Sequence, residues 1–290
     1  MTVTRAAPAL TVVERDIAPV GPYRLPGAGR DGVMVRREGA LERVIHTEDQ
    51  PVVVRAWQVA DGVRFRAEGP SASVASEAIR RMSFALGVDH DLREFQRRYR
   101  WDPLIGPVIR RRPWVRPRRR PEPFEALAWA VCEQLIESGR AAAIQRRIVH
   151  RLGRRSACGA LRAPPSAEAV SRCSPAELDA CGLAPKRSIA LVRAAREVAS
   201  GRASLDRHEP SWQRLLAISN IGSWTIDMLA FTGQGRDDML PAGDLAYVIL
   251  VGRLTGMRRR ATEREVREYF APYGEHAALA GTYALQRRYL

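Results

Sequence analysis

The chain has 290 residues, enough for one large domain or two to three small ones with a buried core. Its 47 basic and 32 acidic residues give a formal net charge of +15, with a pI of about 10.9. Such a surplus indicates a polyanionic partner, and the absence of any run of roughly 18 apolar residues argues against a membrane-spanning protein.

The four cysteines, Cys132, Cys158, Cys173 and Cys181, are scattered and form no C-x-x-C pair. This spacing does not fit a zinc site, an iron–sulfur cluster or a disulfide framework. We therefore expect buried free thiols in a reducing cytoplasm. The N-terminus has no charged start followed by a long apolar run, so we expect a cytoplasmic protein that is not exported.

The first part of the chain predicts a small α+β domain. Residues 1–20 are expected to be flexible. Residues 21–105 contain short β-like runs broken by Gly and Asp, and then a helical stripe from Ser73 to Leu86. Asp61-Gly62, between the last two runs, is a strong hairpin signal. The interpretation is a small antiparallel β-rich N-terminal domain.

A segment dense in proline and arginine follows at residues 106–123. Because prolines disfavour a helix, we expect the segment to be extended on the surface. A solvated linker and direct contact with phosphates both explain this composition. Its arginines are Arg110, Arg111, Arg112, Arg116, Arg118, Arg119 and Arg120.

From Phe124 onward the patterns are helical, so residues 106–290 are predicted to form an all-α core. One long amphipathic pattern runs from Phe124 to Leu152. Ser174-Pro175-Ala176-Glu177 has the residue types of a capping box, and a further helix from Pro185 to Ser200 is closed by Gly201. The fold class is therefore α+β, with a β-rich front and a helical remainder.

Residues 212–232 predict two short helices joined by a tight turn. The turn is Ser219-Asn220-Ile221-Gly222, and the second helix begins near Ser223. Asn220 and Gly222 are residue types that tolerate a left-handed backbone. Free N–H groups at the start of the second helix would suit a phosphate of DNA.

Asp244 follows a helix stop and precedes the apolar run Leu245 to Leu254, so it lies at a helix N-terminus. Asp is a preferred N-cap residue, and local sequence alone favours that structural role. A helix N-terminus also favours an ionised carboxylate. A catalytic role therefore needs support from a larger pattern.

That pattern begins with the segment Leu216 to Thr225. Asp244 follows twenty residues after Trp224 and ends a Leu-Pro-x-x-Asp motif. It resembles the helix–hairpin–helix DNA glycosylase superfamily, and most closely its bacterial 3-methyladenine DNA glycosylase II branch. Phe124-Glu125-Ala126-Leu127 leading to Gln134-Leu135, and Gly182-Leu183 with Lys186-Arg187, also resemble this family. The resemblance covers about residues 105–290, and the β-rich front agrees in general character.

The resemblance implies that Asp244 is the catalytic aspartate, which stabilises positive charge on the sugar and assists water. In bifunctional members a lysine attacks the sugar, but the matching position here is Trp224, and Lys186 is the only lysine. We therefore expect a monofunctional enzyme without lyase activity.

The resemblance also implies roles in binding. Trp224 is expected to line the base pocket, where an indole stacks on a cationic base, although a core tryptophan is the structural alternative. Leu135 matches the wedge that fills the gap left by a flipped base, with Gln134 beside it; an ordinary core leucine is the alternative. The remaining pocket positions depart from the aromatic family pattern and are Met228 and Thr282, with Tyr283 adjacent.

The hairpin of this family often holds a monovalent cation through backbone carbonyls, which by position belong to Leu216, Ile218 and Ile221. We expect no required cofactor beyond this possible Na⁺ or K⁺ ion. No cysteine follows Cys181, so we expect no iron–sulfur cluster.

The first hypothesis is a monofunctional DNA glycosylase that excises alkylated purines in base excision repair. Its partner would be damaged double-stranded DNA, and it would act as a nucleoid-associated monomer. The altered pocket at Met228 and Thr282 leaves open a glycosylase for an oxidised or deaminated base. A non-catalytic DNA-binding protein, with Asp244 as a plain cap, is the third hypothesis.

Overall fold

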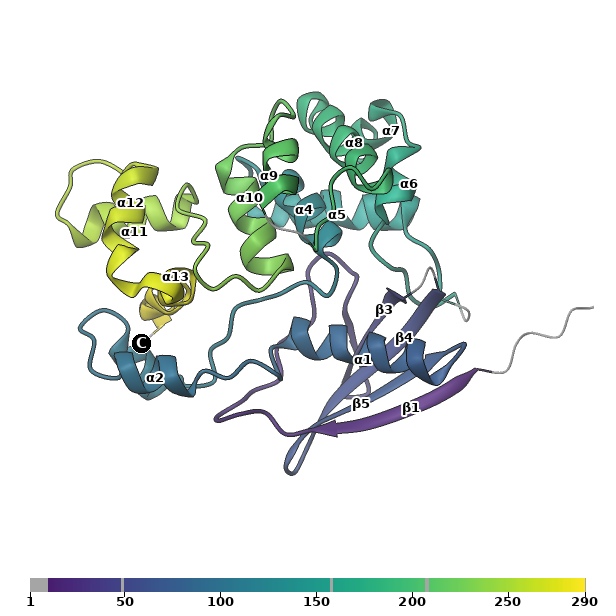
Figure 1. Cartoon of the computed structure of the whole chain (residues 1–290), viewed down its shortest axis with the longest axis horizontal. Helices are drawn as coiled ribbons and strands as arrows, with labels where there is room; N and C mark the ends of the chain where they lie inside the picture. The colour runs from purple at the N-terminus through teal and green to yellow at the C-terminus, as the bar shows by residue number, and fades with distance from the viewer. Residues whose placement is uncertain (1–9, 48–49, 157–158, 207–208, 290) are drawn as a thin grey trace, which may run out of the picture.

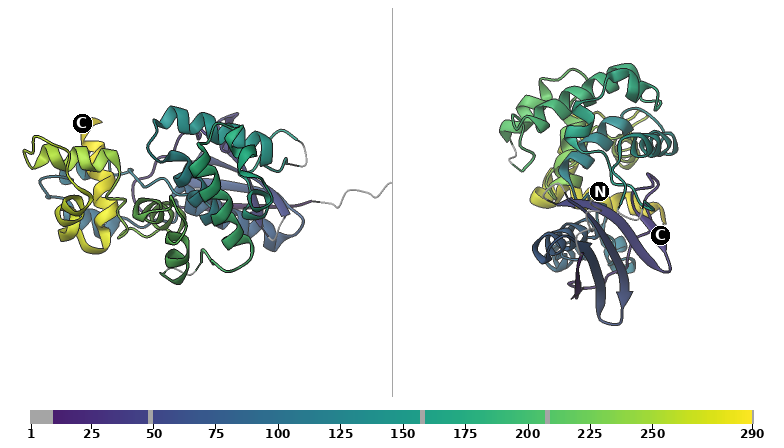
Figure 2. Two further views of the ribbon diagram at one scale, coloured as in Figure 1. Left: turned by 90° about the horizontal axis from the view of Figure 1, so that it is seen from above. Right: turned by 90° about the vertical axis from the view of Figure 1, so that its right-hand side faces the viewer.

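The computed structural model describes residues 10–47, 50–156, 159–206 and 209–289. A sheet with one covering helix forms the N-terminal part, and the remaining helices form two groups with separate cores. Figures 1 and 2 show the middle group, α4 to α10, stacked over the sheet, with the group of α11 to α13 beside it. The predicted α+β fold class is confirmed.

The N-terminal sheet is antiparallel and has five strands in the order β1-β5-β4-β3-β2. Helix α1 (Ala72–Leu86) packs on it, and alternate strand residues such as Val54 and Phe65 are fully buried against this helix. The strands are β1 (Thr11–Ile17), β2 (Val35–Arg37), β3 (Ala40–Thr47), β4 (Gln50–Val59) and β5 (Gly62–Gly69).

The predicted β4–β5 hairpin is confirmed, although Ala60 and Asp61 form its turn. Gly62 is needed for a different reason, since a Cβ there would lie 2.5 Å from the carbonyl oxygen of Ile17. The glycine therefore lets the end of β1 approach β5 closely.

The expectation that residues 1–20 are flexible is wrong for β1 (Thr11–Ile17). This strand pairs with β5 along its whole length, and its acidic residues meet arginines across the ladder. Asp16 accepts two hydrogen bonds of 2.6 Å from Arg64, and Glu14 accepts one of 3.1 Å from Arg66. These cross-strand pairs stabilise a strand whose own apolar pattern is weak.

The middle helical group has its own core, which includes Leu127, Trp129, Leu191 and Leu229. The predicted capping box at Ser174 and Glu177 is present, and Gly201 follows the end of α8 in the left-handed conformation, with φ 72°. The helices are α4 (Pro123–Glu133), α5 (Ser138–Leu152), α6 (Ala167–Ser171), α7 (Pro175–Asp179), α8 (Pro185–Ala199), α9 (Glu209–Leu216) and α10 (Ser223–Met228), the last continued by the π-helical turn Leu229–Gly233.

The third group combines helices from two distant parts of the sequence. Phe95 and Tyr99 pack in one core with Phe270 and Tyr283. Its elements are α2 (Arg93–Tyr99), α3 (Gly106–Arg111), α11 (Leu245–Leu254), α12 (Glu263–Phe270), α13 (Ala277–Gln286) and the 3-10 helices Ala271–His276 and Arg287–Tyr289. The boundary expected at residue 105 therefore falls inside this group, because the apolar residues of α2 pack against the C-terminal helices and not against the sheet.

The Arg-rich segment was expected to contain no helix, and this expectation is wrong for α3 (Gly106–Arg111). The proline of α3 lies in the first turn, where the backbone N–H has no partner within the helix, so proline is tolerated there. Residues 112–122 are irregular, as expected, and cross between the helical groups (Figure 1). Several arginines here bind protein groups. Arg116 donates to the carbonyl of Pro22 at 2.7 Å, and Arg119 pairs with Asp237 at 3.0 Å.

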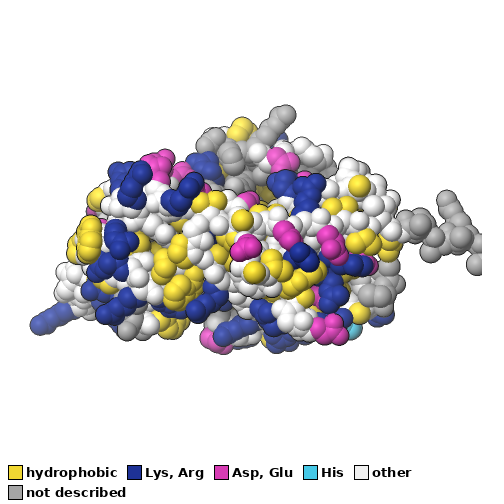
Figure 3. Space-filling view, turned by 90° about the horizontal axis from the view of Figure 1, so that it is seen from below, with side chains coloured by type: hydrophobic (Ala, Val, Ile, Leu, Met, Phe, Trp, Pro, Cys, Tyr) yellow, Lys and Arg dark blue, Asp and Glu magenta, His cyan; other side chains and the backbone are white. Residues whose placement is uncertain are grey.

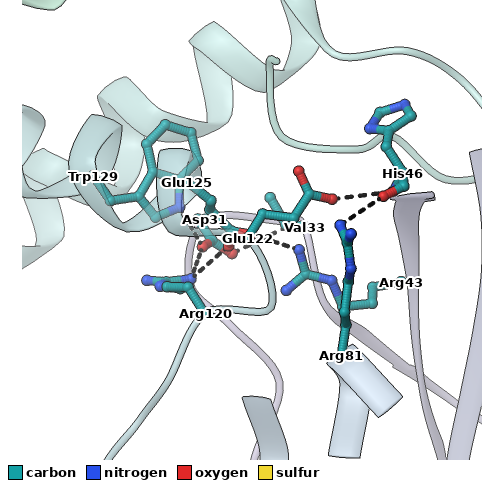
Figure 4. Close-up of polar contacts among 9 residues, drawn as sticks. All are labelled: Asp31, Val33, Arg43, His46, Arg81, Arg120, Glu122, Glu125 and Trp129. Atoms are coloured by element: carbon teal, nitrogen blue, oxygen red, sulfur yellow. Dashed lines mark hydrogen bonds and ion pairs between the residues drawn. The ribbon is translucent and has the colours of Figure 1, made fainter. Parts of the chain in front are cut away.

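A buried polar cluster joins the sheet to the middle group (Figure 4). Arg43 of β3 pairs with Glu125 of α4 at 2.7 Å, and Arg120 pairs with Asp31 at 2.7 Å. Trp129 also donates to Asp31 at 3.0 Å. Burial alone would raise the pKa of Asp31, but the Arg120 guanidinium outweighs it and holds that pKa below its usual value. Such a paired cluster fixes the orientation of the two parts at a cost in desolvation.

Three of the cysteines, Cys132, Cys173 and Cys181, are buried free thiols as expected, while Cys158 lies outside the described residues. Among the described residues, no helix is long and apolar enough to cross a membrane. The same residues contain no group of three or more His, Cys, Asp or Glu side chains arranged to hold a metal ion.

Candidate active site

Helices α9 and α10 form the predicted hairpin. Asn220 has φ 70°, so its expected left-handed conformation is confirmed. The same expectation for Gly222 is wrong, since this residue is extended, with φ −114°, and is the N-cap of α10. A Cβ at Gly222 would meet no protein atom within 4 Å. Neither the backbone nor the packing of the described residues requires glycine at this position.

The carbonyl oxygens expected to hold a cation lie around this turn. The carbonyl of Ile218 accepts the amide of Ile221 at 3.0 Å. Within the described part of the chain, the carbonyls of Leu216 and Ile221 accept no backbone hydrogen bond, so they are free to act as oxygen ligands. Of the three expected carbonyls, that of Ile218 is therefore engaged within the turn, and those of Leu216 and Ile221 have no backbone partner among the described residues.

Leu135 lies in the break between α4 and α5, where one continuous helical pattern was expected. Its φ is 52° and its side chain is fully exposed, at 104%. The alternative that Leu135 is an ordinary core leucine is therefore wrong. An exposed leucine held in the left-handed region is unfavourable for folding by itself, and such strain is typical of functional positions.

Hydrogen bonds from neighbouring elements hold this turn. The amide of Gln134 donates to the carbonyl of Asn220 and to the hydroxyl of Thr225, each at 2.9 Å. Arg187 of α8 donates to the carbonyls of Cys132 and Gln134, at 3.1 and 2.9 Å. The structure thus ties the turn that carries Leu135 to the hairpin.

Asp244 is the N-cap of α11, and its two oxygens have different partners. Oδ1 accepts the amide of Ala246 at 2.8 Å, which is the capping bond. Oδ2 accepts the indole N–H of Trp224 at 3.3 Å. Asp244 therefore caps its own helix and also faces α10, so the carboxylate and the tryptophan twenty residues before it meet in space.

The other expected pocket residues divide into two classes. Met228 and Thr282 are half-buried, and Thr282 donates to the carbonyl of Ala278 at 3.0 Å. Tyr283 is fully buried, donates to the carbonyl of Val115 at 2.9 Å and packs on Phe95. The expectation that Tyr283 lines the pocket is wrong, because its ring is enclosed in the core of the C-terminal group.

Two residues near Asp244 were not expected from the sequence. Tyr247 lies one turn further along α11, and burial, followed by the charge of Asp244, raises the pKa of its hydroxyl. Glu133, the last residue of α4, lies directly before Gln134 and lines a cleft of about 640 Å³. Helical spacing from Asp244 could have indicated Tyr247. Glu133 gave no signal, since polar residues are common at helix ends.

A polar network joins α10 to α12 next to this site. Arg267 pairs with Asp227 at 2.6 Å and with Glu263 at 2.8 Å, and Ser223 donates to Glu263 at 3.2 Å. Burial raises the pKa of Asp227 to about 6 against the opposing charge of Arg267. The network holds the two helical groups together on either side of Asp244.

On the face that Figure 3 shows, the distribution of charge does not mark a binding surface. Basic side chains are spread over the whole face in Figure 3, with acidic ones among them. The hairpin, Leu135 and Asp244 are therefore a more specific indication of a nucleic-acid site than the net charge.

The chain is similar to known proteins in both sequence and fold. Residues 128–275 match the model of the HhH-GPD superfamily of base excision DNA repair proteins. The chain is 26% identical over 203 residues to DNA-3-methyladenine glycosylase of Bacillus subtilis (strain 168), covering 68% of this chain and 67% of that protein. It is 31% identical over 152 residues to DNA-3-methyladenine glycosylase 1 of Schizosaccharomyces pombe (strain 972 / ATCC 24843), covering 50% of this chain and 63% of that protein.

Among solved structures, 3-methyladenine DNA-glycosylase from Archaeoglobus fulgidus superposes with a TM-score of 0.79 at 21% identity, covering 96% of this chain and 99% of that one. This likeness includes the N-terminal sheet, so the two proteins share their whole fold.

Proposed function

Because the chain belongs to the HhH-GPD superfamily of base excision DNA repair proteins, we propose that it is a monofunctional DNA glycosylase for alkylated purines such as 3-methyladenine. The names of its B. subtilis and S. pombe relatives support this substrate class. The observation that carries the proposal is the position of Asp244. Its carboxylate faces the hairpin helix through Trp224, and the hairpin in turn is bonded to the turn that presents Leu135.

In the proposed reaction the damaged nucleotide leaves the stack and Leu135 fills the gap. Removing an exposed leucine from water into the duplex offsets part of the cost of flipping, which is roughly a few kcal/mol. Trp224 orients the carboxylate of Asp244 through its N–H donor, and the capping bond from Ala246 fixes the other oxygen. A carboxylate with both oxygens held in this way is organised before the reaction begins.

The bond between the base nitrogen and the sugar C1′ then breaks, and both bonding electrons leave with the base. A cationic alkylated base departs as a neutral molecule, while positive charge develops on the sugar and is stabilised by the Asp244 carboxylate. Water adds to C1′ and gives up a proton to the Asp244 carboxylate, which returns it to solvent. A monovalent cation bound by the Leu216 and Ile221 carbonyls would contribute only to holding the DNA phosphate.

We propose that no lyase step follows. A Schiff-base mechanism needs an amine at the sugar, and Trp224 occupies the position of the family's lysine. Lys186, the only lysine, is an exposed residue in the first turn of α8. Treatment with borohydride during turnover should therefore trap no covalent protein–DNA complex. A trapped complex would contradict the monofunctional assignment.

The second candidate is a glycosylase for a neutral oxidised or deaminated base. It is favoured by Met228 and Thr282, which offer less aromatic surface to a cation than the family pattern. Duplexes that each carry one lesion distinguish the candidates. Release of N7-methylguanine supports the first proposal. Release of hypoxanthine or 8-oxoguanine alone supports the second, and salt-sensitive binding without release of any base contradicts both.

A further inference from the structure

We propose that Arg267 is a positioning residue for the proposed reaction, because it fixes how the hairpin helix α10 lies against α12 and so places the carboxylate of Asp244 opposite Trp224. The inference rests on the proposed function and names a residue that acts on the reaction through Asp244. Arg267 lies on α12, within a ring of four polar side chains that joins the two helical groups.

The ring has two members on each helix. Ser223 and Asp227 lie four residues apart on α10, so they share one face of that helix, and Glu263 has the same spacing from Arg267 on α12. The hydroxyl of Ser223 donates to Oε2 of Glu263 at 3.2 Å. One nitrogen of Arg267, Nη2, donates both to Oε1 of Glu263 at 2.8 Å and to Oδ2 of Asp227 at 2.6 Å. The two helices are therefore joined at two points one turn apart, which fixes both their separation and their angle.

The ring crosses the boundary between two separate apolar cores. Helix α10 contributes Ile226 to the core of the middle group, while α12 contributes Val266 to the core of the C-terminal group. Trp224 donates to Asp244 across the same boundary. The relative position of the two groups therefore sets the geometry between the indole and the carboxylate, and the ring joins the groups directly beside them.

The ring also lies against the backbone that leads into Asp244. A Cβ on Gly243 would lie 3.2 Å from Oε2 of Glu263 and 3.7 Å from Cβ of Trp224, so this backbone is enclosed between the ring and the tryptophan. The bond from Trp224 to Asp244, at 3.3 Å, is longer than most N–H···O bonds. A small outward movement of the C-terminal group would therefore break it, and Asp244 would lose the donor that orients its second oxygen.

Stability does not account for the buried carboxylate of the ring. Asp227 is 3% exposed, and burial raises its pKa to about 6 although Arg267 lies beside it. Since this value lies above the ordinary 3.8, holding the ionised carboxylate at neutral pH lowers the free energy of unfolding. A buried ion pair of this kind costs desolvation, and what it contributes is the fixed orientation of the two parts that it joins.

The position of Arg267 predicts which step of the reaction it affects. Asp244 stabilises the charge that develops on the sugar, so a displaced carboxylate raises the barrier of the chemical step. In the proposed function the DNA is held by the hairpin and the turn of Leu135, which are bonded to each other within the middle group. Loss of Arg267 should therefore lower the maximal single-turnover rate and leave the half-saturating enzyme concentration almost unchanged.

The experiment measures single-turnover release of N7-methylguanine by wild type, Arg267→Lys and the double variant Arg267→Met with Asp227→Asn. The double variant breaks the ring without leaving an unpaired charge in the protein interior. We expect its maximal rate to fall about 10- to 100-fold, the loss expected when a catalytic group is misplaced by up to about 1 Å. Arg267→Lys should retain most of the rate, because one ammonium nitrogen can replace the single nitrogen that makes both bonds.

The matched control is the double variant Arg64→Met with Asp16→Asn. It removes an ion pair of the same length, 2.6 Å, from the N-terminal sheet, and its arginine is exposed to the same extent, 42% against 41% for Arg267. The net charge of the protein is unchanged in both double variants. The control should release the base at the wild-type rate, and urea unfolding checks that all four proteins are folded under the conditions of the assay.

A wild-type maximal rate in the Arg267 double variant would contradict the inference and leave the proposed function intact. A higher half-saturating concentration at an unchanged maximal rate would also overturn it, since Arg267 would then be a contact to DNA. Equal losses of rate in the two double variants would show a general effect of lost ion pairs and would likewise contradict it. Failure of the wild type to release N7-methylguanine would contradict the proposed function and the inference together.

Discussion

Replacing Leu135 with glycine should stabilise the fold or leave it unchanged while it impairs activity on paired lesions. The left-handed backbone at φ 52° costs an L-residue about 1–2 kcal/mol, which glycine avoids. The greater freedom of glycine in the unfolded chain offsets about 0.5–1 kcal/mol of this gain. Because the side chain is fully exposed, no packing is lost. The net change in the free energy of unfolding should lie between about 0 and 1.5 kcal/mol in favour of glycine.

The loss of activity follows from the same side chain. A leucine buried in the base stack contributes about 1.5–3 kcal/mol, which corresponds to a roughly 10- to 100-fold lower rate of base release. Leu135→Ala is the matched control, since it removes the wedge but keeps the backbone strain. Its unfolding free energy should stay within about 0.5 kcal/mol of wild type. Lesions in an unpaired bulge, where flipping is easier, should be released nearly normally by both variants.

The assays are urea unfolding and single-turnover base release from paired and bulged lesions. If Leu135→Ala is destabilised by more than about 2 kcal/mol, the leucine is packed in solution and its assignment as a wedge is wrong. If both variants release paired lesions at the wild-type rate, Leu135 has no role in flipping.

Three further substitutions test the surrounding site. Gln134→Ala removes both bonds to the hairpin, so it should lower stability by about 1–3 kcal/mol and slow release from paired lesions; unchanged activity would show that the tether is dispensable. Asn220→Gly should preserve DNA affinity and Asn220→Val should lose it, because glycine, like asparagine, tolerates φ 70° and a β-branched valine does not; equal affinities in a binding titration would contradict this. The pKa of Asp227 is about 6 in the folded state and 3.8, its ordinary value, in the unfolded state. Between these two values the folded protein binds the proton more tightly, so the free energy of unfolding of the wild type should fall as pH rises from 3.8 to 6. Relative to Asp227→Asn, which does not titrate, the fall should be up to about 3 kcal/mol. Parallel stability curves across this range of pH would refute it.

Local sequence patterns predicted the elements whose stability is local. The capping box at Ser174 and the left-handed Asn220 are formed by short-range geometry, and both are present. The strand β1 was missed because its stability comes from pairing with β5, including the pairs of Asp16 with Arg64. Such contacts leave little trace in the apolar periodicity of one strand.

The helix break at Leu135 could not be predicted from periodicity for a similar reason. Its residues continue an amphipathic pattern, but Gln134 bonds to a hairpin that is 86 residues distant along the chain. The resemblance to a known family nevertheless predicted that Leu135 is a wedge and so lies outside the core, and its side chain is exposed. Tyr283 was assigned to the pocket only because it adjoins Thr282. Neighbouring residues on a helix point in different directions, and Tyr283 points into the core.

The sequence linked Asp244 to Trp224 only by their spacing of twenty residues. In the structure the indole N–H of Trp224 donates to Oδ2 of Asp244 at 3.3 Å. What the sequence could not supply is the second role of the carboxylate, since one oxygen caps α11 while the other faces the site. Asparagine caps helices as well as aspartate does, so the two roles can be separated by experiment.

The most direct test is therefore single-turnover release of N7-methylguanine by Asp244→Asn, with Asp61→Asn as the control. Asp61 lies exposed in the β4–β5 turn, so its replacement changes the net charge equally at a remote position. We predict that Asp244→Asn unfolds at the wild-type temperature but releases the base about 100- to 1,000-fold more slowly, while Asp61→Asn behaves as wild type. Release by Asp244→Asn at the wild-type rate would show that Asp244 is only a helix cap and would contradict the proposed mechanism.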